Sequence, residues 1–74
     1  MKFSAMQLKE IAFMGGNVVI NADDYTVLQI KEIIFAGKAK GSSVVIKKAC
    51  NLTAMQCKEL AYVNPNHVTF DFTE

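Results

Sequence analysis

Two cysteines and one histidine carry the most reactive side chains in this sequence. A structural zinc site needs four ligands at close spacing, and Cys50, Cys57 and His67 do not supply that pattern. A cysteine nucleophile needs a base beside it, and nothing in the sequence brings His67 to either thiol. We interpret Cys57 as a small buried apolar residue and His67 as a solvated residue at the start of a strand. Cys50 lies in a turn and would be reactive only if exposed, so we predict no metal site and no catalytic residue.

Asp23 and Asp24 are the remaining pair of groups that could do acid–base chemistry. Carboxylates that share such work usually come from separate elements that face each other across a cleft. These two are adjacent and precede a predicted helix, where negative charge complements the helix dipole. We therefore assign them a structural role, and we expect a non-enzymatic protein without a cofactor or a small-molecule substrate.

A local group of lysines is the best sequence argument for an anionic partner. The glycine-containing stretch 37–43 is similar to a phosphate-binding loop, but it runs from a predicted helix into a strand, the reverse of a Walker-type loop. There is no arginine, no aromatic residue alternates with the lysines, and the net charge is only +1. Anion or nucleic-acid binding is therefore the alternative function. Its residues would be Lys38, Lys40, Lys47 and Lys48.

Composition indicates a single small domain, residues 1–74. A chain of this length buries only about 60–65% of the surface that it exposes when unfolded, so its core is small. Apolar residues make up 51% and charged residues 20%, which leaves few polar side chains for the surface and favours association with itself or another protein. Gln7, Lys9 and Glu10 interrupt the first apolar stretch, so we expect no signal peptide, no membrane span and a cytoplasmic location.

Three segments of the chain share one pattern of residue types. Each begins with Ser or Thr, has Gln three residues later, continues through an apolar residue and a Lys-Glu pair, and ends on an aromatic residue. The segments are 4–13, 26–35 and 53–62. Each is followed by a run of residues typical of a strand, rich in β-branched or aromatic side chains, and we predict strands at 18–21, 44–47 and 68–72. The chain therefore divides into three helix–strand units, at about 3–23, 24–50 and 51–74.

Each segment has the start and stop signals of a helix. The hydroxyls of Ser4, Thr26 and Thr53 can cap the first turn, and the glutamine three residues later completes a capping box. A glycine or asparagine stands eleven positions after each cap, and we expect it in the left-handed conformation that ends a helix. These stops are Gly15, Gly37 and Asn64.

Repeated helix–strand units predict an α/β fold with parallel strands joined by right-handed crossovers. Short links favour sequential strand order, so we expect a three-stranded parallel sheet with all helices on one face, as in a short solenoid. The strand side chains that should face the helices alternate along each strand. They are Val18, Ile20, Val44, Ile46, Val68, Phe70 and Phe72. A second apolar stripe on each helix should pack between neighbouring helices, which would leave Leu28 and Phe35 best buried.

The other sheet face has no segment left to cover it, although parallel sheets are normally covered on both faces. We expect a protein-interaction or self-association module that binds through this open face. Its expected contacts are Val19, Asn21, Val45, Lys47, Thr69 and Asp71. The arrangement resembles leucine-rich repeats, which also stack a strand and a helix per unit and bind partners on an open sheet. The strands Val18–Ile20 and Val44–Ile46 carry this resemblance, which implies the architecture and no individual binding residue.

Overall fold

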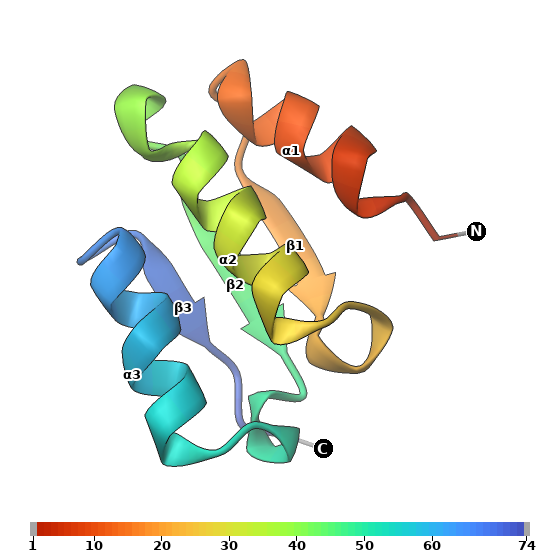
Figure 1. Ribbon diagram of the computed structural model, residues 1–74, viewed down its shortest axis with the longest axis vertical. Helices are drawn as coiled ribbons and strands as arrows, with labels where there is room; N and C mark the ends of the chain where they lie inside the picture. The colour runs from red at the N-terminus through yellow and green to blue at the C-terminus, as the bar shows by residue number, and fades with distance from the viewer. Residues whose placement is uncertain (1, 74) are drawn as a thin grey trace.

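The computed structural model describes residues 2–73 as three successive helix–strand units (Figure 1). The α-helices and β-strands alternate along the chain. They are α1 (Ala5–Phe13), β1 (Val18–Asn21), α2 (Val27–Ala36), β2 (Val44–Lys47), α3 (Ala54–Val63) and β3 (Val68–Phe70). Three short 3-10 helices join them. These are η1 (Ala22–Asp24), η2 (Lys38–Lys40) and η3 (Ala49–Asn51).

All three helix starts are those predicted, and each is closed by a complete capping box. The hydroxyls of Ser4, Thr26 and Thr53 accept from the backbone N–H three residues later at 3.1–3.2 Å. The glutamine side chain at that place accepts from the N–H of the cap residue at 2.9 Å. Two donors that have no partner within the helix are thereby satisfied in every unit.

The helix ends follow the prediction only at Gly15, which has a φ of +98°. Gly37 has a φ of −90° and Asn64 one of −149°, so the prediction of a left-handed stop is wrong at both. In these two links the left-handed residues are Gly41 at +71° and Asn66 at +73°, because each link makes an additional turn before its strand. Glycine is required at 37 for space instead, since a Cβ there would lie 2.6 Å from the Cβ of Ser42.

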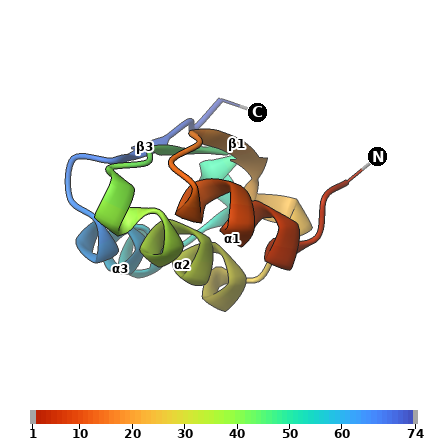
Figure 2. The ribbon, with the colours of Figure 1, turned by 90° about the horizontal axis from the view of Figure 1, so that it is seen from above.

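The strands form one parallel sheet in the order β1-β2-β3, and the three α-helices cover one of its faces, as predicted (Figure 2). The units are in register, with Val18 opposite Val44 and Val44 opposite Val68. The third strand is shorter than predicted. Asp71 still donates its N–H to β2, but its side chain then accepts from the N–H of Thr73 in a turn. Phe72 consequently lies 58% exposed, so the prediction that it packs against the helices is wrong.

The core lies between the sheet and the helices. Its strand side chains are Val18, Ile20, Val44 and Ile46, as predicted, with Val68 and Phe70 packed at its margin. From the helices it takes Leu8, Ala12, Ile30, Ile33, Ile34 and Leu60, with Ala22 and Ala49 from the 3-10 helices.

The prediction that Leu28 and Phe35 are best buried is wrong, because they are 63% and 66% exposed. The reason is their angular position on the helix. Counted from the N-cap, Leu28 stands at position 2 and Ile30 at position 4; at ~100° per residue they lie about 160° apart. Ile30 lies on the sheet, so position 2 faces away from it, and position 9, occupied by Phe35, does so as well.

Candidate interaction surfaces

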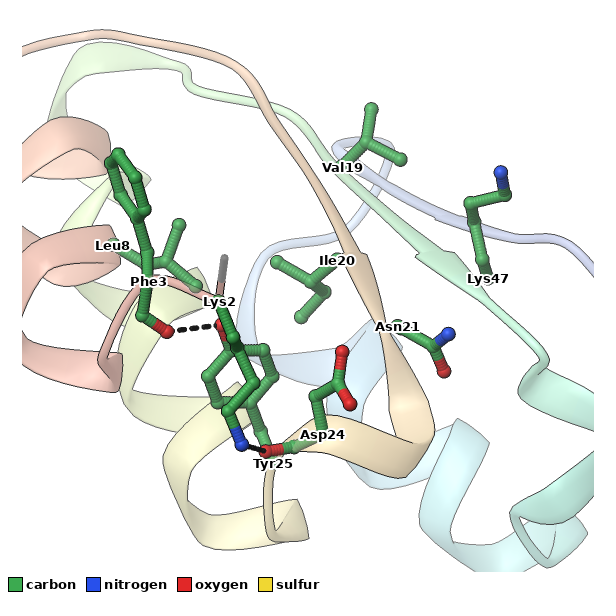
Figure 3. Close-up of a pocket in the computed structure, with 9 residues that line it drawn as sticks. All are labelled: Lys2, Phe3, Leu8, Val19, Ile20, Asn21, Asp24, Tyr25 and Lys47. Atoms are coloured by element: carbon green, nitrogen blue, oxygen red, sulfur yellow. Dashed lines mark hydrogen bonds between the residues drawn. The ribbon is translucent and has the colours of Figure 1, made fainter.

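The uncovered face of the sheet presents the residues predicted for it. Val19 is 63% exposed, and Lys47 and Thr69 are exposed too, whereas Asn21, Val45 and Asp71 are half-buried. The register places Val19, Val45 and Thr69 in one row across the three strands and Asn21 opposite Lys47. Figure 3 shows Val19 and Lys47 on this side of the sheet, opposite to the side taken by Ile20. The sheet therefore gathers the predicted contacts on one face, with apolar and polar rows.

Two of these residues are already engaged in local hydrogen bonds. The Asn21 side chain accepts from the N–H of Asp23 at 3.0 Å, and the Asp71 side chain accepts from that of Thr73 at 3.0 Å. The Thr73 hydroxyl also donates to Asp71. The Thr73 hydroxyl and N–H, with Lys47 contributing less, lower the pKa of the Asp71 carboxyl below its ordinary value. These two side chains thus shape the strand ends as well as the open face.

Asp23 makes a hydrogen bond that the sequence analysis did not predict. Its carboxylate accepts from the side-chain amide of Asn51 at 2.8 Å, which joins η1 to η3. Within residues 2–73, no group of three or more His, Cys, Asp or Glu residues is placed to hold a metal ion.

A hollow of about 650 Å³ lies between the N-terminal segment, β1 and the start of α2 (Figure 3). Its polar groups already bind one another. The Tyr25 hydroxyl donates to the carbonyl of Phe3, and Lys2 donates to the carbonyl of Asp24 at 3.1 Å, with its ammonium 5.4 Å from the centre of the Tyr25 ring. Burial, and secondarily the charge of Asp24, raises the pKa of Tyr25. These hydrogen bonds therefore fasten the N-terminal segment to η1 and to Tyr25 that follows it, and the residues of the hollow present no acid–base pair.

The four lysines of the alternative prediction do not form one patch. Lys38 and Lys40 lie in η2, before β2, whereas Lys47 ends β2 and Lys48 follows it. The two pairs are thus at opposite ends of that strand (Figure 1). Each end presents two positive charges to an anion, fewer than the sequence suggests.

The cysteines are free, with Cys50 exposed and Cys57 half-buried. Burial raises the pKa of the Cys57 thiol, which keeps it protonated and less nucleophilic. The prediction that Cys57 is buried is wrong, because α3 has no following helix within residues 2–73 to cover it. His67 is half-buried rather than solvated, and its imidazole lies near Gly41 in the preceding link.

A second surface, which sequence reasoning missed, lies on the side of the helices away from the sheet. We call it the outer helical surface. It consists of positions 2 and 9 of each helix, and these side chains are 60–83% exposed. The residues are Met6, Phe13, Leu28, Phe35, Met55 and Tyr62. The recurrence of large apolar residues at both positions was visible in the sequence. Their angle of about 160° to position 4 identifies them as external once the structure shows that position 4 lies on the sheet.

No known protein family, curated protein or solved structure matches this chain. Across residues 2–73, none of the helices combines the length and apolar character that a membrane crossing would need.

Proposed function

We propose that this protein is a non-enzymatic protein-interaction module that binds its partner through the outer helical surface. The observation that supports this function is the exposure of a large apolar residue at positions 2 and 9 of all three helices. Scattered apolar residues are normal on a protein surface, whereas large exposed apolar residues that recur at the same two positions of every unit favour an interaction site.

The arrangement of the surface indicates what the partner presents. Positions 2 and 9 are seven residues apart, so the two apolar rows run across the helices about 10 Å from each other at ~1.5 Å per residue. Lysine and glutamate occupy positions 5 and 6 between them, and Lys9 approaches Glu32 at 3.7 Å. Such a surface fits a protein with large apolar side chains at matching separation and polar groups of both charges between them.

The open sheet face is the second candidate surface. It is favoured by Val19, which is 63% exposed on a face that parallel sheets normally cover. The outer helical surface ranks first because all six of its large apolar side chains are at least 60% exposed, whereas Val45 at the middle of the sheet face is half-buried.

A cytoplasmic location is part of this proposal. Both cysteines are free thiols, and reducing compartments maintain cysteines in this state.

Anion binding is the alternative function, and the separation of the lysine pairs weakens its support. Nucleic-acid binding through lysines depends steeply on salt, so a gel shift at low salt that disappears at higher salt would favour it. The absence of a shift at low salt would exclude it.

The interaction surface is tested by paired variants on the two faces. Phe35→Glu changes the outer helical surface, and Val45→Asp changes the open sheet face. Proteins captured by the wild-type chain are identified, purified and titrated against all three forms by calorimetry. We expect Phe35→Glu to weaken binding at least about tenfold, because it buries a charge among apolar contacts. We expect Val45→Asp to bind as the wild type does.

The outcomes separate the two surfaces. If only Val45→Asp loses binding, the partner binds the open sheet face and not the outer helical surface. Unchanged affinity in both folded variants would contradict the proposal. Far-ultraviolet circular dichroism of each variant establishes that it is folded, and a Val45→Asp chain that unfolds would mean that Val45 belongs to the core.

A further inference from the structure

The two ends of the stack of units expose positions that are buried inside it. Because Lys9 at position 5 of α1 approaches Glu32 at position 6 of α2, the side of each helix that carries positions 6 and 7 faces the preceding unit. At position 7, Ile33 and Leu60 are 0% exposed, whereas Ile11 is 37% exposed. Within residues 2–73, α1 has no preceding unit, and its outer side is an uncovered junction surface.

This uncovered side of α1 is apolar and uneven. Ile11, Phe3 and Met14 surround a shallow hollow there, together with Gln7 and Glu10. The side chains of Phe3 and Met14 are exposed as well. We call this surface, with the free edge of β1, the leading end of the molecule.

The side of α3 that faces away from α2 is uncovered within residues 2–73. It carries small, half-buried residues at positions that are buried in α1 and α2. At position 8, Ala61 is half-buried, whereas Ala12 and Ile34 are buried. At position 4, Cys57 is half-buried, whereas Leu8 and Ile30 are buried. We call this surface, with the free edge of β3, the trailing end. Its small side chains leave room for the larger ones of the leading end.

The sheet edges at the two ends are complementary in their hydrogen bonds. In both observed junctions, the N–H that begins one strand donates to the carbonyl just before the next strand: Val18 to Ser43 at 3.1 Å and Val44 to His67 at 2.9 Å. Alternate residues of a parallel strand bond to alternate sides, so the peptide groups of Val68 face away from β2. By the same rule, the peptide groups of Val19 face the free edge of β1.

The charges at the two ends are complementary as well. At the junction of the first two units, Lys9 at position 5 of α1 approaches Glu32 at position 6 of α2 at 3.7 Å. The trailing end presents Lys58 at position 5 and the leading end presents Glu10 at position 6, both exposed. A second copy in the same register would bring Lys58 of one chain to Glu10 of the other.

We propose that the protein self-associates head to tail, with the trailing end of one copy against the leading end of a second copy. β3 pairs in parallel with β1 of the next copy, with Val68 opposite Val18, so that the sheet continues without a break. The two ends lie on opposite sides of the molecule (Figure 1), so the association is heterologous and extends beyond a dimer. This pairing uses the unpaired strand edges and leaves the outer helical surface free for the function proposed above.

Charge reversal at the junction tests the proposal, with the molar mass measured by light scattering and sedimentation velocity from micromolar to millimolar concentration. We expect the wild-type mass to increase with concentration past that of a dimer. Glu10→Lys and Lys58→Glu should each weaken association about tenfold or more, because each places like charges opposite one another. The double variant, and an equimolar mixture of the two single variants, should recover the wild-type behaviour.

Three outcomes would overturn head-to-tail association. These are a wild-type chain that stays monomeric at millimolar concentration, a closed dimer that Lys58→Glu does not affect, and a double variant that fails to recover. Phe35→Glu serves as the control outside the junction and should associate as the wild type does. Phe35→Glu also tests partner binding by the outer helical surface. The two proposals can therefore fail independently, since one variant changes partner binding and the charge reversals change self-association.

Discussion

At the scale of single residues, three cap residues set where the helices begin. Ser4, Thr26 and Thr53 all have an extended backbone, and all make the same pair of hydrogen bonds with a glutamine. This local exchange depends on atoms three residues apart, which is why each cap works in the same way despite its different surroundings.

Removal of a cap hydroxyl should therefore cost the same in different units. We expect Thr26→Ala and Thr53→Ala each to lower the free energy of unfolding by ~1 kcal/mol, since one N–H of the first turn loses its partner. Urea denaturation followed by circular dichroism measures the change, with Thr26→Ser, which keeps the hydroxyl, as the control. A negligible loss at both sites would mean that the capping boxes do not stabilise the helices.

The Asp71 carboxyl gives the protein a specific response to acid. Its hydrogen bonds from Thr73 lower its pKa in the folded state, so its stabilising effect is complete above the ordinary carboxyl value of about 4. That effect is lost as the pH falls through the lower folded pKa. We expect the melting temperature of the wild type to exceed that of Asp71→Ala at neutral pH, and the difference to shrink below about pH 4. A difference that stays constant with pH would contradict this role for the carboxylate.

At the scale of elements, the link between α2 and β2 requires a glycine because of close packing and not because of its backbone angles. Gly37 has an ordinary negative φ, yet it has no room for a side chain between Ser42 of the same link and Ala12 of α1. A Cβ at this place would lie 2.6 Å from the Cβ of Ser42 and 3.2 Å from that of Ala12. The Ser42 hydroxyl, itself buried, donates to the carbonyl of Ala12 at 2.8 Å, so neither neighbour can withdraw without breaking this contact.

We therefore expect Gly37→Ala to destabilise the protein by about 1–3 kcal/mol, the usual cost of overpacking a close contact. The free energy of unfolding from urea denaturation measures it. The matched control is Ala36→Gly, at a half-buried position beside it, which removes a methyl group without creating a clash. If Gly37→Ala were as stable as the wild type, the link would have to be more adaptable than this packing allows.

At the scale of the whole molecule, one side of each helix is buried against the sheet and its neighbours, and the opposite side is exposed. Ile33 and Leu28 illustrate the two sides of the same helix, since Ile33 is fully buried and Leu28 is exposed. The middle unit has a helix on each side and supplies three of the five buried isoleucine and leucine side chains of the helical layer, so much of the core depends on it.

A pair of truncations in α2 tests this division. Ile33→Ala should lower the free energy of unfolding by ~2–5 kcal/mol, because it leaves a cavity in the core. Leu28→Ala should change it by less than about 0.5 kcal/mol, as expected for an exposed residue. Chemical denaturation of both variants gives the comparison, and equal losses would indicate that the outer helical surface is covered in solution.

The sequence by itself determined the features that depend on neighbours along the chain. The capping boxes at Ser4, Thr26 and Thr53, the bounds of β1 and β2, and the sequential parallel sheet were all predicted correctly. These features follow from hydrogen bonds within a few residues and from the alternation of side chains along a strand. Both depend only on the types of residues that are close together in the sequence.

The tertiary structure alone decided which flanks of the helices meet. The expectation for Leu28 and Phe35 failed because apolar character at a position does not say whether a neighbour covers it. The contact between helices uses positions 5 to 7, and positions 2 and 9 are left outside. For the same reason, only the structure shows that Lys38 and Lys48 lie at opposite ends of β2, and that Gly37 has no room for a side chain. Burial and proximity depend on how whole elements pack, and residues far apart in the chain fix that packing together.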